Sequence, residues 1–390
     1  MTSFLLHDVF DPTSRLAVAM SGGVDSSVAA WMLREDGHPL VGLFMRNGVA
    51  IPEEQAGKKS CCSAGDARDA RMVAAALDIP FQAVDLKREF GELIRHFVAE
   101  YQAGRTPNPC ALCNRDLKFD ALLECADAVG AAGVATGHYA RVGRVDGRVA
   151  VRRGVDRAKD QSYQLFAVRE EHLERTRLPL GELTKPQVRE LAERAALRTA
   201  KKADSQEICF VPGNDYRRLL AERGVEFRPG PMVDTAGRAL GTHDGIERYT
   251  IGQRRGLGIA TGTPMYVVDL LVDSATVVLG PVDACASRWL ELDGINWIGV
   301  DAPASGHLEA DVQVRYHHSA APADVHVSGA RVRVEFKSPQ LAVAAGQGAA
   351  LYRGDRLIGG GWIARAERPP RVAPNASEPS AREPEAAPAP

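Results

Sequence analysis

Residues 15–36 read RLAVAMSGGVDSSVAAWMLRED, a short apolar strand followed by a glycine turn and an apolar helix. Two glycines let the backbone approach an anion closely, and the free N–H groups at the start of a helix attract negative charge. Ser21, Ser26 and Ser27 add hydroxyl donors. The turn therefore predicts a phosphate cradle. It is not a Walker A loop, because the lysine of GxxxxGK[ST] is absent, and it also lacks the GxGxxG dinucleotide fingerprint.

Strands and helices alternate beyond this turn up to about residue 140. The pattern predicts strands at 15–20, 38–45, 79–86 and 133–139, with helices at 28–36, 66–78, 88–104 and 114–130. Strands separated by helices of this length form a parallel sheet, and ligands bind such a sheet beyond the carboxyl ends of its strands. A hairpin strand at 148–153 and a capped helix from Thr184, with proline in its first turn, follow.

Short β-type runs broken by glycine and proline follow residue 210. They predict a small β-rich unit and then a β-barrel or sandwich, with a boundary near residues 280–288. From Pro369 onward, proline and alanine supply 13 of 22 residues, which is typical of a disordered tail. The predicted architecture is α/β, with a Rossmann-like parallel-sheet domain (1–210), a small β-rich central domain (211–284), a C-terminal β-barrel (285–368) and a disordered tail (369–390).

The composition is that of an ordinary soluble globular protein. The chain has 390 residues, 45% hydrophobic and 25% charged, with 48 Lys+Arg against 50 Asp+Glu and a formal net charge of −2. This balance argues at first against a dedicated nucleic-acid binder. No run approaches the ~18 apolar residues that a membrane helix requires, and the N-terminus lacks a signal-peptide pattern. We therefore expect a cytoplasmic protein with no membrane partner.

Seven cysteines, an odd number, argue against a structural disulfide framework. Cys113 stands at the start of a predicted helix and Cys209 follows Lys201 and Lys202, and both settings favour a thiolate. Three interpretations stay open: unreactive thiols, a structural zinc site, and a pair of thiols that carry sulfur. Zinc prefers two CxxC-type pairs, and only one is present. Cys61 and Cys62, in a Gly/Lys/Ser-rich loop, are expected to be exposed thiols without a role.

The SGGVDS turn resembles the pyrophosphate loop of the ATP-pyrophosphatase superfamily, whose members bind ATP, release pyrophosphate and leave an adenylated substrate. Six further motifs narrow the resemblance, namely RTPNPCALCNRDLKF (105–119), ATGHYAR (135–141), AKDQSYQLF (158–166), KADSQEICFVPG (202–213), YTIGQRRGLG (249–258) and ALYRGDRLIGGGWI (350–363). In this order, from about residue 14 to 365, the chain resembles the tRNA-specific 2-thiouridylase family. That family thiolates C2 of the wobble uridine in tRNAs for Lys, Glu and Gln, using ATP. The resemblance implies tRNA and a cysteine desulfurase or sulfur-relay protein as partners.

The resemblance also assigns roles to single residues. Cys113 would be the nucleophile and Cys209 the persulfide carrier, and the two would form a transient disulfide. ATP would be held by Ala19, Met20, Ser21, Gly22, Gly23, Val24, Asp25, Ser26, Met45 and Gly137, with Mg²⁺ beside Asp25. The tRNA would be held by Asn108, Pro109, Cys110, His138, Lys159, Asp160, Gln161, Arg315, Tyr316 and Gln347.

Cys110 departs from the family pattern. Some members have an aspartate here, against the target base, and a cysteine cannot serve as that carboxylate. A general-base role at this position is therefore in question. Cys110 also forms a CxxC motif with Cys113, and together with Cys209 a three-thiolate iron–sulfur site is an alternative use of these thiols.

Basic residues cluster locally despite the neutral average. Between Arg141 and Asp160 seven Arg/Lys stand against three Asp, and further clusters lie at 198–202 and 248–255. Local clusters of this kind bind RNA phosphates. We therefore expect an enzyme that adenylates the C2 oxygen of the flipped wobble uridine and replaces it with sulfur from Cys209. The alternatives are a pyrophosphate-loop synthetase acting on a small metabolite and a tRNA-binding protein without catalysis.

Overall fold

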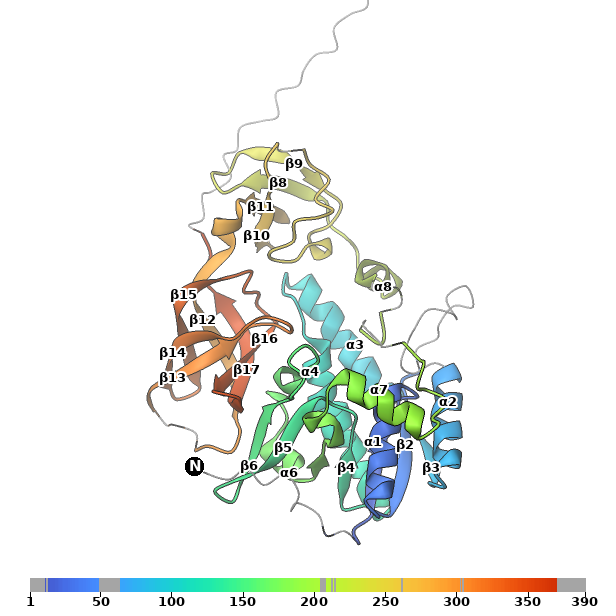
Figure 1. The fold of residues 1–390 in the computed structure, drawn as a ribbon. Coiled ribbons are helices and arrows are strands. Elements are labelled where there is room, and N and C mark those ends of the chain that lie inside the picture. Colours follow the sequence, from blue (N-terminus) through green and yellow to red (C-terminus); the bar gives the residue numbers. More distant parts are fainter. Residues whose placement is uncertain are drawn as a thin grey trace, which may run out of the picture.

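Three bodies of secondary structure follow one another in the computed structural model of the chain (Figure 1). The structure describes residues 11, 13–48, 64–203, 208–211, 213, 215–260, 262–301, 303 and 305–369. A five-stranded sheet covered by helices comes first, a four-stranded sheet second and a β-barrel third. The predicted α/β fold with a β-rich centre and a C-terminal barrel is confirmed.

The first sheet is parallel throughout, in the order β3-β2-β1-β4-β7. Its strands are β1 (Leu16–Ala19), β2 (Leu40–Arg46), β3 (Phe81–Asp85), β4 (Gly133–Ala135) and β7 (Thr176–Arg177). The main helices around it are α1 (Val24–Glu35), α2 (Ala64–Ala76), α3 (Lys87–Gln102), α5 (Leu122–Ala128) and α7 (Lys185–Arg194). Leu16 and Val18 share a core with α1, α2 and α7, whereas Ala17 packs with α5 on the other face. Successive strand residues point to opposite faces, so β1 contributes to both cores.

The helix that carries the CxxC motif is irregular. One helix was predicted over 114–130, but the structure has α4 (Pro109–Cys113), then a π-helix over Asn114–Ala121, then α5. Apolar periodicity does not distinguish π turns from α turns over so short a run. Such turns are rare and often occur at functional sites.

Six strands form a closed C-terminal barrel in the order β12-β15-β14-β13-β16-β17. They are β12 (Ala286–Trp297), β13 (Ser305–Gln313), β14 (Ala321–Ser328), β15 (Arg331–Leu341), β16 (Gly348–Arg353) and β17 (Arg356–Ala366). Pairing of β12 with β17 closes the ring, so the unit is a barrel and not a sandwich. The hairpin of β5 (Ala140–Val145) and β6 (Arg148–Arg153) extends the same sheet, because β6 pairs with β17. A hairpin from the first half of the chain thus fastens that half to the barrel.

The central body is smaller. It contains α8 (Tyr216–Glu222) and a sheet in the order β10-β11-β8-β9. Its strands are β8 (Gly230–Asp234), β9 (Ala239–His243), β10 (Tyr266–Leu271) and β11 (Thr276–Gly280). The remaining short helices are α6 (Glu170–Glu174) and 3₁₀ turns at Ser162–Leu165, Pro179–Glu182, Ile246–Arg248 and Val282–Cys285.

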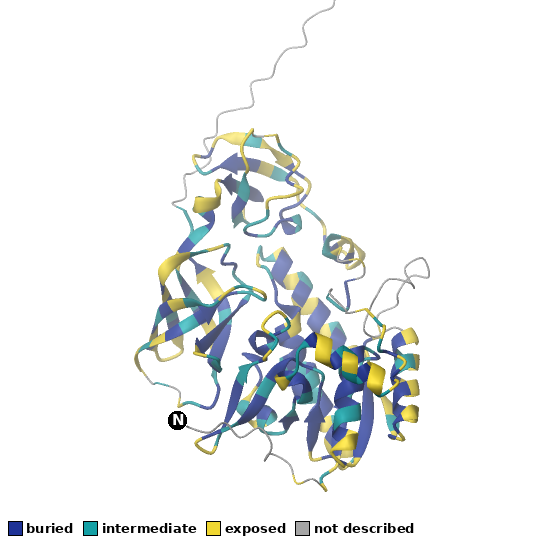
Figure 2. Cartoon of the chain, viewed as in Figure 1, coloured by how far each residue is buried: buried dark blue, intermediate teal, exposed yellow. Residues whose placement is uncertain are grey.

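Burial follows these layers. Buried residues run along the strands of the first sheet and the barrel, and exposed residues lie on the outer sides of α2 and α7 (Figure 2). In the part of the chain that the structure describes, no helix is both long and apolar enough to span a membrane.

Candidate active site

The glycine turn after β1 is held in shape by its own serines. Ser26 Oγ accepts the Ser21 N–H at 3.1 Å and donates to the Gly23 carbonyl at 3.2 Å. Ser27 Oγ donates to the same carbonyl at 2.8 Å. Gly22 has a φ of +73°, and a Cβ there would lie 2.2 Å from the carbonyl oxygen of Asp66 in α2. Glycine is therefore required at position 22, and the serine hydrogen bonds hold the turn in this conformation.

Asp25 is paired with a lysine from far along the chain. Lys185 Nζ lies 2.7 and 2.8 Å from the two carboxylate oxygens, and the Tyr139 hydroxyl donates to Oδ1 at 2.7 Å. Lys185 is the first residue of α7 and is buried. Its ammonium group is thereby fixed on one side of the turn.

A second lysine holds the other side of the turn. Lys202 Nζ donates to the Gly22 carbonyl at 2.9 Å and to the carboxylates of Asp66 and Asp69 at 2.7 Å each. Burial disfavours the charged form of Lys202, but its hydrogen bonds to the two carboxylates outweigh burial and raise its pKa. The sequence placed Lys202 near Cys209 as a group that stabilises the thiolate; the structure shows it bound to the turn and α2. Tertiary structure thus supplies two lysines beside a turn that has none of its own.

A cavity of about 310 Å³ opens beside the turn. Nine of the ten residues predicted for ATP line it, all except Gly22, and so do His138, Lys159, Gln161 and Tyr316, which were predicted for tRNA. Gly137, at the end of β4, abuts the turn, because a Cβ there would lie 2.8 Å from the Ser26 nitrogen. Asp66, Lys118, Thr136, Tyr139, Lys185 and Lys202 also line the cavity, although the sequence did not place them in the nucleotide site. All six lie outside the glycine turn, so only the tertiary structure identifies them.

The candidate sulfur-carrying cysteines meet in one apolar cluster. Cys113 is buried in a core formed with α3 and α8, and Cys209 packs against the same core. Met45, which lines the cavity, packs there too. Cys110 is exposed at the start of α4. The cluster therefore adjoins the cavity on the side of β2.

Two other cysteines have the properties of unreactive thiols. Burial raises the pKa of Cys125, with the charges of Glu124 and Glu89 adding to the effect, and burial also raises the pKa of Cys285. A raised pKa keeps a thiol protonated at neutral pH. Cys61 and Cys62 lie outside the described residues.

The donor groups do not form a site for a resident metal. Among the residues with a described position, no three His, Cys, Asp or Glu side chains gather closely enough to hold an ion. The two carboxylates that line the cavity, Asp25 and Asp66, are each bonded to a lysine. The described residues therefore hold no preformed metal site at Asp25 or at Cys110, Cys113 and Cys209.

Family models match three consecutive parts of the chain. They describe a tRNA methyl transferase HUP domain at residues 14–213, a tRNA methyl transferase PRC-barrel domain at 219–281 and an aminomethyltransferase β-barrel domain at 287–363. The tRNA-specific 2-thiouridylase MnmA of Heliobacterium modesticaldum is 47% identical over 359 residues, which cover 90% of this chain and 92% of that protein. The protein of the same name from Geobacter metallireducens is 48% identical, with 90% and 96% covered. The chain belongs to the tRNA-specific 2-thiouridylase family.

Solved structures are similar over shorter stretches. The U34-tRNA thiolase NcsA from Methanococcus maripaludis has a TM-score of 0.35 at 18% identity, covering 56% of this chain and 67% of that one. With a TM-score this low, the structural similarity carries no argument about this chain.

His138, one of the residues predicted to hold tRNA, is buried in the wall of the cavity. Burial, and then the charge of Lys118, hold the pKa of His138 well below its usual range. Lys118 Nζ lies 3.3 Å from Nε2 and can only donate, so Nε2 accepts. The proton is therefore on Nδ1, which donates to Thr136 Oγ1 at 2.6 Å. His138 thus holds Lys118 at the wall of the cavity.

Tyr316 lies over the cavity beside another ring. Its ring is 6.5 Å from that of Tyr163, nearly parallel at 29°. Burial, helped by the charges of Asp160 and Cys110, raises the pKa of Tyr316 to about 12, so the phenol stays neutral. A neutral aromatic ring at this position is suited to stacking on a base.

Several other residues assigned to tRNA bond within the protein. Asp160 accepts the Gly154 and Ser162 N–H groups on Oδ1, at 2.9 and 3.1 Å. Its Oδ2 accepts from Arg153 at 2.9 Å and from the Ser162 hydroxyl at 3.0 Å. Asp160 is buried, so these bonds use the carboxylate inside the protein.

Elsewhere, Asn108 caps α4, with Pro109 in the first turn, and Arg315 donates to the Leu341 carbonyl at 3.3 Å. Gln347 donates to the Thr106 and Pro107 carbonyls. None of these residues, nor Asp160 and Cys110, belongs to the lining of the 310 Å³ cavity.

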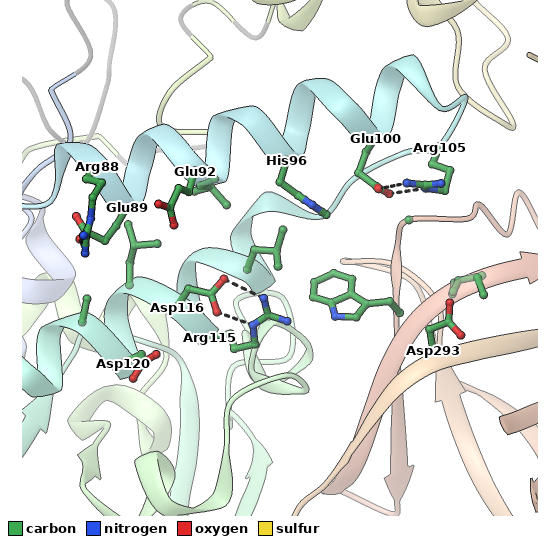
Figure 3. A pocket seen from close by; sticks show the side chains of 18 of the residues that line it. Arg88, Glu89, Glu92, His96, Glu100, Arg105, Arg115, Asp116, Asp120 and Asp293 are labelled. Carbon is green, nitrogen blue, oxygen red and sulfur yellow. Dashed lines mark hydrogen bonds and ion pairs between the residues drawn. The ribbon is translucent and has the colours of Figure 1, made fainter. Parts of the chain in front are cut away.

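A larger cavity, of about 790 Å³, lies between α3, the π-helix and the barrel. It is lined by Glu89, Glu92, Glu100, Asp116, Asp120, Glu124 and Asp293, as well as by Arg88, Arg105 and Arg115 (Figure 3). Each arginine is paired with a carboxylate: Arg88 with Glu89, Arg105 with Glu100 and Arg115 with Asp116. Seven carboxylates against three guanidinium groups repel a polyphosphate or RNA. The smaller cavity beside the turn is therefore the nucleotide-site candidate.

Proposed function

We propose that this chain is a cytoplasmic tRNA-uridine 2-sulfurtransferase that makes 2-thiouridine at the wobble position of tRNAs for Lys, Glu and Gln. One observation carries the proposal. The glycine turn with its two lysines shares a single cavity with Lys159, Gln161 and Tyr316. ATP phosphates and an extruded base would meet in that space. Membership of the 2-thiouridylase family supports the reaction class.

In the first step the C2 oxygen of the uridine attacks the α-phosphorus of ATP. The bond to the bridging oxygen breaks, pyrophosphate leaves, and the N3 proton is released to water. AMP on the C2 oxygen is then the leaving group of the next step. Charge builds up on the departing pyrophosphate, which the turn would cradle and which Lys185 and Lys202 would stabilise. Mg²⁺ would arrive bound to the phosphates of ATP.

In the second step sulfur arrives as a persulfide on Cys209, loaded by a cysteine desulfurase or a sulfur-relay protein. Along one route the terminal sulfur attacks C2 and expels AMP, and the Cys113 thiolate then attacks the Cys209 sulfur of that adduct. Along the other, Cys113 attacks the persulfide first and releases HS⁻, which attacks C2. Both routes end in 2-thiouridine and a Cys113–Cys209 disulfide that an external dithiol reduces. Packing of both cysteines on one cluster supports this pairing.

The test is reconstitution of the reaction. The full chain is incubated with ATP-Mg²⁺, a cysteine desulfurase, ³⁵S-cysteine, a dithiol and unmodified tRNA, and nucleosides are then analysed by mass spectrometry. Labelled 2-thiouridine is the expected product. Cys209→Ser should abolish the label and keep pyrophosphate release. Cys125→Ser, which changes a thiol outside the site, should leave both unchanged.

The two alternatives predict different results. A synthetase for a small metabolite would release pyrophosphate with that metabolite and without RNA. A tRNA-binding protein without catalysis would bind tRNA and neither release pyrophosphate nor incorporate label. Either result, or full thiolation by Cys209→Ser, would contradict the proposal.

A further inference from the structure

The loop that leads into the CxxC motif cannot form all of its backbone hydrogen bonds within itself. Thr106-Pro-Asn-Pro109 contains two prolines, which have no N–H and interrupt local hydrogen bonding. Its residues are half-buried or buried, and the Thr106 and Pro107 carbonyls take their donors from elsewhere in the chain. Those donors come from the barrel, more than 200 residues along the chain.

Gln347, just before β16, supplies both donors with one side chain. Its Nε2 donates to the Thr106 carbonyl at 3.1 Å and to the Pro107 carbonyl at 2.9 Å. The Thr106 N–H in turn donates to the Ala345 carbonyl at 2.8 Å. The barrel segment 345–347 therefore binds the loop through three hydrogen bonds.

A second chain of bonds reaches the first turn of α4. The Tyr163 hydroxyl donates to the Gly348 carbonyl at 3.0 Å and accepts from Asn108 Nδ2 at 3.4 Å. Asn108 Oδ1 caps α4 by accepting the Ala111 N–H at 3.1 Å. Gln347 and Gly348 are thus connected to both ends of the segment just before Cys110.

The backbone contact at this place is too close for any side chain. Gly346 has a φ of +87°, and a Cβ there would lie 2.8 Å from Glu100 Oε2 and 2.9 Å from the Thr106 carbonyl oxygen. Glu100 is buried and held by Arg105, its partner at the end of α3 (Figure 3). The Gly346 N–H and Gln347 carbonyl are bonded to Ile363 of β17 at 2.8 Å each. On the barrel side, residues 346–347 are therefore themselves held by hydrogen bonds to β17.

We propose that Gln347 is a positioning residue that sets the place of Cys113 by holding the Thr106–Pro107 carbonyls against the barrel. This inference rests on the proposed function and changes the role expected for Gln347, which was contact with tRNA. An RNA phosphate accepts hydrogen bonds, and both amide hydrogens of Gln347 are already donated within the protein. Loss of these bonds would displace the cysteine helix with little effect on RNA affinity.

The test compares Gln347→Met with Gln340→Met. Methionine keeps the side-chain length and removes the donors. The side-chain amide of Gln340, on β15, donates to the carbonyls of its neighbours Ser338 and Pro339, so Gln340 serves as the matched control. At saturating tRNA, the single-turnover rate of thiolation should fall by about 10- to 100-fold in Gln347→Met, the range expected for a displaced catalytic group. The Kd for tRNA should stay within about twofold, and Gln340→Met should change neither value.

Chemical labelling of Cys113 separates this inference from the proposed function. In Gln347→Met the buried Cys113 should react with iodoacetamide at least about fivefold faster than in the unaltered chain, measured by mass spectrometry, while Cys285 reacts at an unchanged rate. This readout needs no enzymatic activity, so it decides the role of Gln347 even if no 2-thiouridine is formed. A Kd raised tenfold or more, with unchanged labelling and an unchanged rate at saturating tRNA, would overturn the inference in favour of tRNA contact.

Discussion

At the scale of single residues, two lysine ammonium groups beside the glycine turn are held in place by carboxylates. Buried Lys185 is paired with Asp25, and half-buried Lys202 with Asp66 and Asp69, so neither ammonium lacks a counter-charge. An unpaired buried charge is costly, whereas a paired one is tolerated. The arriving triphosphate would share cations that are already in place, which lowers the reorganisation needed during reaction.

Lys185→Met should reduce tRNA-dependent pyrophosphate release by about 100-fold, because a positioned donor to developing charge contributes roughly that factor. Lys201→Met is the control, since Lys201 is exposed and outside the cavity lining. Melting temperatures of both variants establish that they fold. Release within twofold of the unaltered chain would show that Lys185 serves only to hold Asp25.

His138 makes stability depend on pH. Its pKa is lowered in the folded protein, mainly by burial, and is about 6.5 in an unfolded chain. The unfolded state therefore binds the extra proton first as pH falls, and stability is lost below about pH 6.5. Between pH 7.5 and 5.5 this group should lower the free energy of unfolding by an amount on the order of 1 kcal/mol.

The corresponding variant is His138→Gln, whose Oε1 replaces the Nε2 acceptor for Lys118. Urea unfolding of both proteins at the two pH values measures the difference. On acidification the variant should lose less stability than the unaltered chain, by on the order of 1 kcal/mol. Equal losses would mean that His138 is charged in the folded protein.

Secondary-structure elements add further junctions between the first half of the chain and the barrel. The β5–β6 hairpin pairs with β17, and β12 reaches back toward the segment after Tyr163. Asn296 of β12 donates its amide to the Phe166 carbonyl at 3.0 Å and to the Val168 carbonyl at 2.8 Å. Phe166 and Val168 follow closely after Gln161, which lines the 310 Å³ cavity. The barrel therefore helps to hold the chain segment that follows the cavity-lining Gln161.

Asn296→Ala should lower the free energy of unfolding by about 1–3 kcal/mol, because two buried carbonyl groups lose their donor. Thermal melting followed by near-UV circular dichroism measures the loss. Asp301→Asn, which weakens an exposed ion pair with Arg148, should melt close to the unaltered chain, because exposed ion pairs contribute little stability. An unchanged melting temperature in Asn296→Ala would show that water replaces the amide at this junction.

At the scale of the whole molecule, charge is segregated. The net charge of −2 averages a carboxylate-lined cavity of about 790 Å³ with lysines around the turn and arginines elsewhere. RNA affinity depends on the local clusters, since each phosphate contact releases a counterion. Arg254 and Arg255, exposed in the central body, are candidates for such contacts.

Replacing Arg254 and Arg255 together by glutamine should weaken tRNA binding and reduce the slope of log Kd against log salt by about 2, one unit for each phosphate contact. Filter binding across a salt series measures the slope. Arg88→Gln is the control, because Arg88 is exposed but stands among the carboxylates of the large cavity. A slope that does not change would place the RNA elsewhere.

Much of the fold was predictable because its signals are local. Apolar runs, their period and the glycine turn indicate β1, α1, the parallel sheet and the β-rich second half, and each signal lies within about 20 residues. The nine predicted ATP residues that line the cavity belong to the turn or to the ends of neighbouring strands. The π-helix after Cys113 was missed, since it follows the same apolar pattern as an α-helix.

By itself the sequence determined the phosphate-binding turn, the α/β architecture with a terminal barrel, and the cysteine pair to examine. Only the tertiary structure brought Lys185 and Lys202 to the turn, across separations of 160 and 180 residues. It alone joined the β5–β6 hairpin to β17, and placed Gln347 against a loop 241 residues earlier. The physical reason is that backbone periodicity records which face of an element is buried, but not which distant side chain will neutralise a charge or satisfy a carbonyl on that face.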